Sequence, residues 1–185
     1  LATTVTSHVY TVMHEGERVV LKIIEDWADE ELVGAVALQH WQGHGAVRLI
    51  RNDDGAHLME YAPGETLDGW VKRGDDAEST EVIAGVLEQL HSVQTAPPTG
   101  LHPLDRWFRD LFTKADEDER AGIASYYVRG AKVARALLAD PREVRVLHGD
   151  IHHENVRQSE RGWLAFDPKG LVGERTYDTA NTLCN

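Results

Sequence analysis

The chain has 185 residues, with 31 acidic side chains against 19 lysines and arginines, and its formal net charge is -12. Such an acidic chain is expected to be repelled by nucleic acid and anionic membranes and to attract a cationic small molecule. No apolar run nears the roughly 20 residues that span a bilayer, no signal segment is recognisable, and the single cysteine, Cys184, excludes an internal disulfide, so we expect a cytoplasmic protein.

The first sixty residues have the pattern of a small antiparallel sheet with one helix. Strands are predicted over residues 5–13, 18–24, 46–50 and 57–61. The last two flank Asn52-Asp53-Asp54-Gly55, which is a strong hairpin turn. Helical spacing of apolar residues and a capping aspartate predict a helix over residues 29–43.

The pattern changes at Ala62-Pro63-Gly64, beyond which helices dominate. Helices are predicted over residues 78–94, 103–114 and 119–139, the first of them with a continuous apolar stripe. Two strands, 144–147 and 162–166, then enclose a polar loop, and we expect them to form a hairpin.

The most informative segment is Leu147-His148-Gly149-Asp150-Ile151-His152-His153-Glu154-Asn155, followed by Asp167-Pro168-Lys169-Gly170. Kinases of the protein-kinase-like fold place an aspartate, an asparagine and a second aspartate at this spacing. The first aspartate contacts the acceptor hydroxyl, and the other two side chains hold Mg²⁺ on the ATP phosphates. Asp150 is therefore the predicted catalytic residue, and Asn155 and Asp167 are the predicted metal ligands.

Lys22 stands in an apolar strand, with Val20 and Ile24 as its neighbours on the same face. A buried ammonium needs an anionic partner, and ATP phosphates together with a helix carboxylate would supply one. Glu31 is the preferred partner and Glu30 the alternative. The competing interpretations are an edge-strand lysine that reaches solvent and two glutamates that merely favour a helix N-terminus.

The strand that ends near Tyr61 leads into the Pro-Gly turn, where an adenine ring would meet the main chain. We predict that Glu60 and Ala62 bind the nucleotide through main-chain atoms. Any strand that leads into a turn has a similar pattern, so an ordinary strand end is the competing interpretation of this segment.

Three histidines, His148, His152 and His153, surround Asp150 and allow a second interpretation, an iron or zinc site of the kind that some oxygenases use. That interpretation explains none of Lys22, Asn155 and Asp167. We expect His148 instead to brace the loop through a main-chain hydrogen bond.

These segments resemble the aminoglycoside and hydroxyurea phosphotransferases, most closely the streptomycin 6-phosphotransferases. The resemblance rests on residues 147–156, 161–168 and 170–178, with weaker support from 41–48 and 101–104. It implies a bilobal, protein-kinase-like α+β fold, MgATP as the phosphoryl donor and an aminoglycoside hydroxyl as the acceptor. It also implies that Asp150 is the base, that Asn155 and Asp167 hold the metal, and that Lys22 contacts the nucleotide.

On this basis we divide the chain into a nucleotide-binding N-lobe (1–61), a hinge (62–66) and a catalytic C-lobe (67–185). The predicted function is ATP-dependent phosphorylation of an aminoglycoside, with streptomycin as the first candidate. Alternatives are a kinase for hydroxyurea or another small molecule, and a nucleotide-binding protein without activity. The sequence indicates no protein partner. Because the chain starts at Leu1 and members of such families continue with further helices, we expect residues to be missing at both ends.

Overall fold

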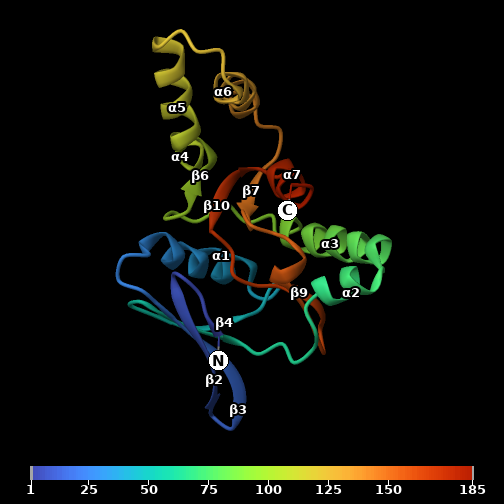
Figure 1. Ribbon diagram of the computed structural model, residues 1–185. Helices are drawn as coiled ribbons and strands as arrows, with labels where there is room; N and C mark the ends of the chain where they lie inside the picture. Colours follow the sequence, from blue (N-terminus) through green and yellow to red (C-terminus); the bar gives the residue numbers. More distant parts are fainter. Residues whose placement is uncertain (1, 185) are drawn as a thin grey trace.

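The computed structural model describes residues 2–184 and begins with a five-stranded antiparallel sheet (Figure 1). Its order is β1-β2-β3-β5-β4. The strands are β1 (Ala2–Thr3), β2 (Ser7–His14), β3 (Glu17–Ile24), β4 (Leu49–Asp53) and β5 (Ala56–Glu60). Tight turns join β2 to β3 and β4 to β5, and Gly16 and Gly55 supply the positive φ angles that these turns require.

The predicted helix over 29–43 is divided into two parts. A 3₁₀ helix, η1 (Asp29–Val33), precedes the α-helix α1 (Gly34–Trp41). No side chain caps either helix at its N-terminus, and three acidic residues occupy the first turn of η1. Gln42 ends α1 in the left-handed conformation. The prediction of one continuous helix was therefore wrong in its first turn.

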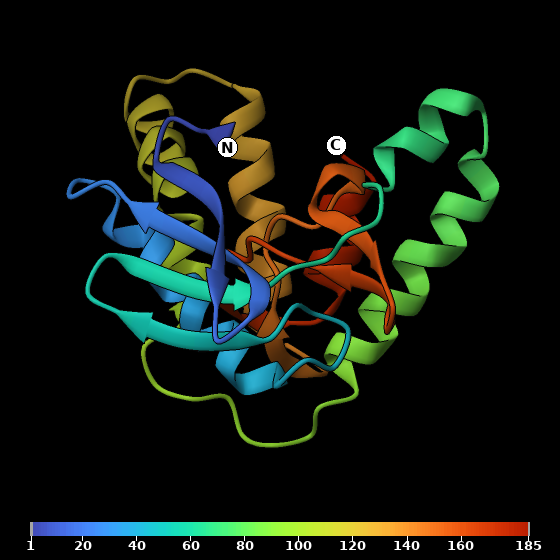
Figure 2. The same cartoon turned by 90° about the horizontal axis from the view of Figure 1, so that it is seen from below.

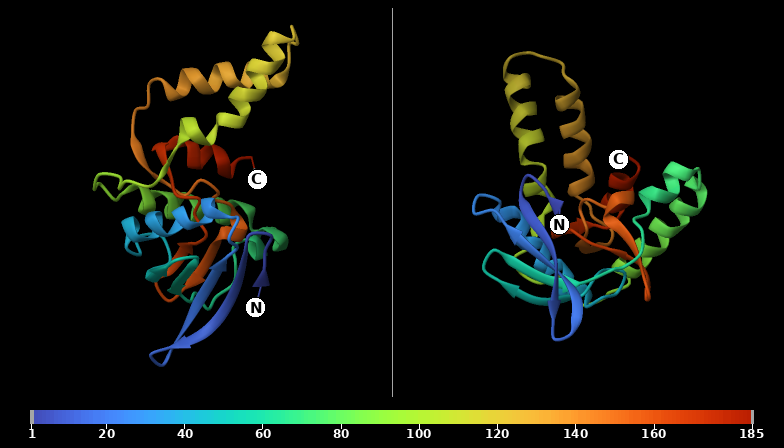
Figure 3. Two further views of the ribbon diagram at one scale, coloured as in Figure 1. Left: turned by 90° about the vertical axis from the view of Figure 1, so that its left-hand side faces the viewer. Right: turned by 60° about the horizontal axis from the view of Figure 1, so that its bottom comes forward.

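The rest of the chain contributes most of the helices. They are α2 (Asp68–Arg73), α3 (Asp76–His91), α4 (Leu104–Trp107), α5 (Arg109–Arg120), α6 (Tyr126–Leu138) and α7 (Thr176–Thr182). Helices α5 and α6 form an antiparallel pair that projects from the rest of the molecule (Figure 3). The predicted helix over 119–139 begins later, at Tyr126, because Gly122 turns the chain and Ser125 caps α6.

The strands around the predicted catalytic segment pair differently from the expected hairpin. They are β6 (His102–Pro103), β7 (Val144–Leu147), β8 (Val156–Ser159), β9 (Gly162–Ala165) and β10 (Leu171–Glu174), with the short 3₁₀ helix η2 (His153–Asn155) before β8. Strand β9 pairs with β8, whereas β7 pairs antiparallel with β10. A hairpin of β7 with β9 was thus a wrong prediction, since residues 156–159 form a closer partner for β9.

One hydrophobic core connects the sheet side of the molecule with the helical side. Its fully buried members include Trp41 and Leu38 of α1, Leu90 of α3, and Val156 and Leu164 of the β8–β9 hairpin. Main-chain hydrogen bonds also connect the two sides. For example, the N–H of Val47 donates to the carbonyl oxygen of Ala165 at 2.9 Å. Figure 2 shows the sheet on one side of the molecule, with α2 and α3 at the opposite edge.

The helices in residues 2–184 include none that is both long and apolar enough to cross a membrane.

Candidate active site

Lys22 lies on β3 between β2 and β5, paired with Val9 on one side and His57 on the other. The residue is only 6% exposed. Its ammonium forms an ion pair with Glu31 in η1, with 2.5 Å between Nζ and Oε2, and another with Oδ1 of Asp167. The expectation of a buried lysine with a helix carboxylate as its partner is confirmed, and Glu31 is that partner.

Glu30, the alternative partner, lies on the surface. Its side chain is 57% exposed and interacts with Arg109 at 3.3 Å. Glu31 instead holds two ammonium groups, because its Oε1 also accepts a hydrogen bond from Lys169 Nζ at 2.9 Å. Burial alone would raise the pKa of Glu31, but the hydrogen bonds from Lys22 and Lys169 outweigh burial and lower this pKa.

Asp150 lies in the loop between β7 and β8, and its side chain is about one-third exposed. The Nε2 atom of His152 is 3.9 Å from Oδ1 of Asp150. Gly149, which precedes the aspartate, has a φ of 83° and is packed against Leu171. The carboxylate is therefore held by a tight turn at the surface of the site, where an incoming molecule can reach it.

Asn155 is tied to the same loop. Its side-chain Nδ2 donates to the main-chain oxygen of Asp150 at 2.9 Å and lies 3.0 Å from Nε2 of His152. Its own main-chain oxygen accepts from the N–H of Phe166 at 3.0 Å. Because the amide nitrogen is engaged inside the loop, the side-chain carbonyl oxygen is left to bind a ligand.

Asp167 follows β9 and has a left-handed backbone, with a φ of 61°. Such a conformation is uncommon for a residue other than glycine and is often found at functional sites. Its side chain contacts Lys22, so residues far apart in the sequence meet at one point.

Asn155 and Asp167 together offer an amide oxygen and a carboxylate, which are hard donors that suit Mg²⁺. In residues 2–184 no three His, Cys, Asp or Glu side chains are grouped so that they could hold a metal ion. A cation bound by these two residues would therefore need further oxygens, such as those of nucleotide phosphates. This donor set fits magnesium held mainly by ATP.

Two buried residues, His148 and Asp178, hold the loop that carries Asp150 through hydrogen bonds to main-chain atoms. His148 is fully buried, and its Nε2 lies 2.9 Å from the main-chain oxygen of Phe166, so the expected bracing role is confirmed. Burial lowers the pKa of His148. Asp178 on α7 accepts hydrogen bonds from the N–H groups of His148 at 3.0 Å and Gly149 at 2.8 Å. It also contacts Nε2 of His91 at 3.0 Å.

Sequence reasoning gave Asp178 no role, although the residue lies within the segment that carries the family resemblance. Its partners precede it by about thirty residues, and no spacing pattern connects them. Lys169 and His57, both close to Lys22 or Glu31, were also given no role. A lysine directly after Asp167-Pro168 was the one signal that could have identified Lys169.

Glu60 and Ala62 lie where β5 leaves the sheet. The side chain of Glu60 accepts hydrogen bonds from Arg161, at 2.6 and 2.9 Å, and from the N–H of Arg48. Its own N–H donates to the carbonyl oxygen of Arg48. Ala62 is buried, and within the described chain nothing is hydrogen-bonded to its main chain. Of the two, Ala62 has the freer main-chain groups.

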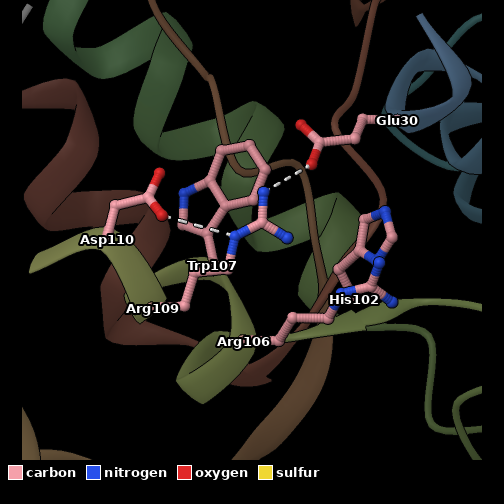
Figure 4. A pocket seen from close by; sticks show the side chains of 6 residues that line it. All are labelled: Glu30, His102, Arg106, Trp107, Arg109 and Asp110. Carbon is pink, nitrogen blue, oxygen red and sulfur yellow. Dashed lines mark hydrogen bonds and ion pairs between the residues drawn. The ribbon is translucent and has the colours of Figure 1, made fainter. Parts of the chain in front are cut away.

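A separate cavity of about 170 Å³ lies beside η1 (Figure 4). It is lined by Glu30, His102, Arg106, Trp107, Arg109 and Asp110. Arg109 links the two carboxylates of this cavity. Glu30, the alternative partner of Lys22, lines it, whereas Glu31 and the other residues around Lys22 do not, so this cavity is distinct from the cluster around Lys22.

Comparison with known proteins gives a consistent result along the whole chain. The family model described as "Aminoglycoside/hydroxyurea antibiotic resistance kinase" matches residues 1–185. This chain belongs to that family. A streptomycin 3''-kinase from Klebsiella pneumoniae is 42% identical over all of this chain and 67% of its own length. A streptomycin 6-kinase from Streptomyces griseus is 35% identical over 89% of this chain and 54% of its own length.

The kinase family assignment agrees with the fold. The solved structure of an aminoglycoside-3'-phosphotransferase of type VIII superposes with a TM-score of 0.66 over 98% of this chain and 74% of that one, at 19% identity. The protein-kinase-like α+β fold predicted from the sequence is thereby confirmed. The chain spans about half to two-thirds of the length of the curated family members it matches.

Proposed function

We propose that this chain carries the catalytic core of an ATP-dependent phosphotransferase that transfers the γ-phosphate of ATP to a hydroxyl of an aminoglycoside. One observation supports the proposal most strongly. Lys22 from the sheet, Glu31 from η1 and Asp167 from the β9–β10 loop meet in one ion-pair cluster. The loop of Asp150 and Asn155 is hydrogen-bonded to the residues that flank Asp167. Phosphoryl transfer depends on such positioning more than on strong acid or base catalysis.

Within this proposal, residues 1–61 bind the nucleotide, 62–66 form the hinge and 67–185 carry the catalytic groups. Lys22 neutralises the phosphates, and Glu31 holds the lysine in place. The main chain of Ala62 and the carbonyl of Glu60 face the adenine edge. Asn155 and Asp167 hold Mg²⁺, which supplies positive charge to the phosphate oxygens when bound.

Asp150 orients the acceptor hydroxyl and accepts its proton late in the reaction. The acceptor oxygen forms a bond to the γ-phosphorus while the bond to the β-phosphate oxygen breaks, and ADP leaves with the electron pair. Partial exposure of Asp150 fits this role because the acceptor must approach the carboxylate from solvent.

Streptomycin is the proposed acceptor because two family members with substantial identity are streptomycin kinases. The net charge of -12 favours a cationic antibiotic over an anionic one. Guanidinium groups such as those of streptomycin pair well with carboxylates. The two relatives differ in the hydroxyl that their names specify, so the position of phosphorylation needs a separate measurement.

The test is mass spectrometry of streptomycin, other aminoglycosides and hydroxyurea after incubation with the purified protein and MgATP. We expect one added phosphate on streptomycin, and fragmentation would locate it at the 3'' or the 6 hydroxyl. Phosphate on hydroxyurea alone would change the acceptor and keep the reaction class. Nucleotide binding without turnover on any acceptor would contradict the proposal and support a non-catalytic nucleotide-binding protein.

A further inference from the structure

A second lysine lies in the site and has no part in the mechanism above. Lys169 donates to Glu31 Oε1 at 2.9 Å, while Lys22 binds the other oxygen of the same carboxylate. The side chain of Lys169 is 26% exposed, compared with 7% for Lys22. The two ammonium groups are thus held as a pair by one carboxylate, and Lys169 is the one nearer to solvent.

The main chain fixes the position of Lys169. Its N–H donates to the carbonyl oxygen of His148 at 2.8 Å, which places it beside the Asp150 loop. A side-chain carbon at Gly149 would lie 3.2 Å from Cβ of Lys169, and one at Gly170 would lie 2.5 Å from the carbonyl oxygen of Val33. The segment that carries Lys169 is therefore packed between the catalytic loop and η1, with little freedom to shift.

Lys169 places a cation beside the loop that carries Asp150. Lysine side chains are protonated at neutral pH, and the ammonium of Lys169 lies 2.9 Å from Oε1 of Glu31. The residues between Asp150 and Asn155 include no lysine or arginine. That loop therefore supplies no permanently charged cation beside the predicted base.

We propose that Lys169 contacts the γ-phosphoryl group of ATP and stabilises its charge during transfer, while Lys22 holds the phosphates that remain on ADP. The inference rests on the proposed function and deepens it. Lys169 gives up no proton in the step. It acts as a fixed positive charge at the oxygens of the group that moves from ADP to the acceptor.

The competing explanation is structural: Lys169 would only tie its loop to Glu31. A structural tie would affect ATP and ADP alike, whereas a γ-phosphoryl contact affects ATP alone. The decisive readout is therefore the ratio of the dissociation constants for MgADP and for a non-hydrolysable MgATP analogue. Calorimetry measures both without an acceptor.

For wild-type protein we expect tighter binding of the ATP analogue than of ADP. Lys169→Met should lower that preference roughly tenfold, because a hydrogen bond between two charged groups is lost, and should change ADP affinity by less than about threefold. Lys169→Arg should restore part of the preference. Lys132→Met, on the exposed side of α6, is the matched control and should keep the wild-type ratio.

An unchanged ratio in a folded Lys169→Met or Lys169→Gln variant would overturn the inference, as would equal losses for ADP and the ATP analogue. Failure of the proposed function has a different signature, namely wild-type protein that binds neither nucleotide or binds both without phosphorylating any acceptor. In the latter case the ratio still tests the contact with Lys169.

Discussion

The fully buried carboxylate of Asp178 on α7 accepts a hydrogen bond of 3.0 Å from the main-chain N–H of His148. The same carboxylate accepts from Gly149 and contacts His91. A residue on α7 therefore anchors the main chain of the loop that carries Asp150. Main-chain donors that lose such a partner in the protein interior are costly to leave unpaired.

We predict that Asp178→Asn lowers the free energy of unfolding by roughly 2–4 kcal/mol, because it replaces a charged acceptor of several hydrogen bonds with an amide. The turnover number should fall more than the nucleotide affinity, since the loop shifts while Lys22 stays in place. Urea denaturation and steady-state kinetics measure the two effects. Asp110→Asn, whose side chain is 92% exposed, is the control and should behave like wild type.

Neighbouring glutamates allow a direct test of the ion-pair cluster. Glu31→Gln removes the carboxylate that pairs with both Lys22 and Lys169, and should lower stability by about 3 kcal/mol and raise the KM for ATP about tenfold or more. Glu30→Gln removes only an exposed pair with Arg109 and should change stability by less than about 1 kcal/mol. Equal effects of the two substitutions would show that Glu31 has no special role.

A buried histidine next to Lys22 predicts acid sensitivity. His57 is 2% exposed, and burial, followed by the charge of Lys22, lowers its pKa from 6.5 to about 4. Between these two values the unfolded chain binds a proton that the folded chain does not, so acidification destabilises the fold. From pH 7 to pH 5 the loss from this residue is about 2 kcal/mol.

His57→Leu should remove that part of the loss. The measurement is the free energy of unfolding in urea at pH 7 and pH 5 for both proteins. Other histidines contribute equally to wild type and variant, so the difference between the two slopes isolates His57. Identical pH dependence in the two proteins would contradict the assigned pKa direction.

Gly149, in the loop that carries Asp150, has no room for a side chain. Its φ of 83° is left-handed, and an added Cβ would lie 2.7 Å from Cδ1 of Leu171. Gly149→Ala should therefore lower stability by roughly 2–3 kcal/mol. Gly85 inside α3 has open space around the same position, so Gly85→Ala should raise stability by about 0.5–1 kcal/mol. Thermal denaturation of both variants measures the contrast, and equal midpoints would contradict the packing described for Gly149.

Features of the site that depend on local pattern could be predicted from the sequence. A lysine inside an apolar strand has few ways to be satisfied, which identified Lys22 and the need for a nearby carboxylate. The spacing of Asp150 and Asn155 within one loop is likewise a local property. The apolar stripe of α3 also matched the buried face of that helix.

Features that depend on long-range pairing could not be predicted. The choice of β10 as the partner of β7 is made by residues more than twenty positions away, and no periodicity encodes it. The role of Asp178 has the same origin, because its carboxylate can accept hydrogen bonds from His148 and Gly149 only after α7 has packed against the loop that carries Asp150. The late start of α6 was different, because Gly122 and Ser125 were visible signals that the predicted helix over 119–139 overlooked.

The most direct test of the central claim is the rate of phosphate transfer from radiolabelled ATP to streptomycin by wild-type protein and by Asp150→Asn. We expect the variant to bind MgATP within about threefold of wild type and to lose transfer by at least about a hundredfold, because the acceptor hydroxyl loses its base and its alignment. A folded Asp150→Asn protein that transfers phosphate at near wild-type rate would contradict the assignment of this site.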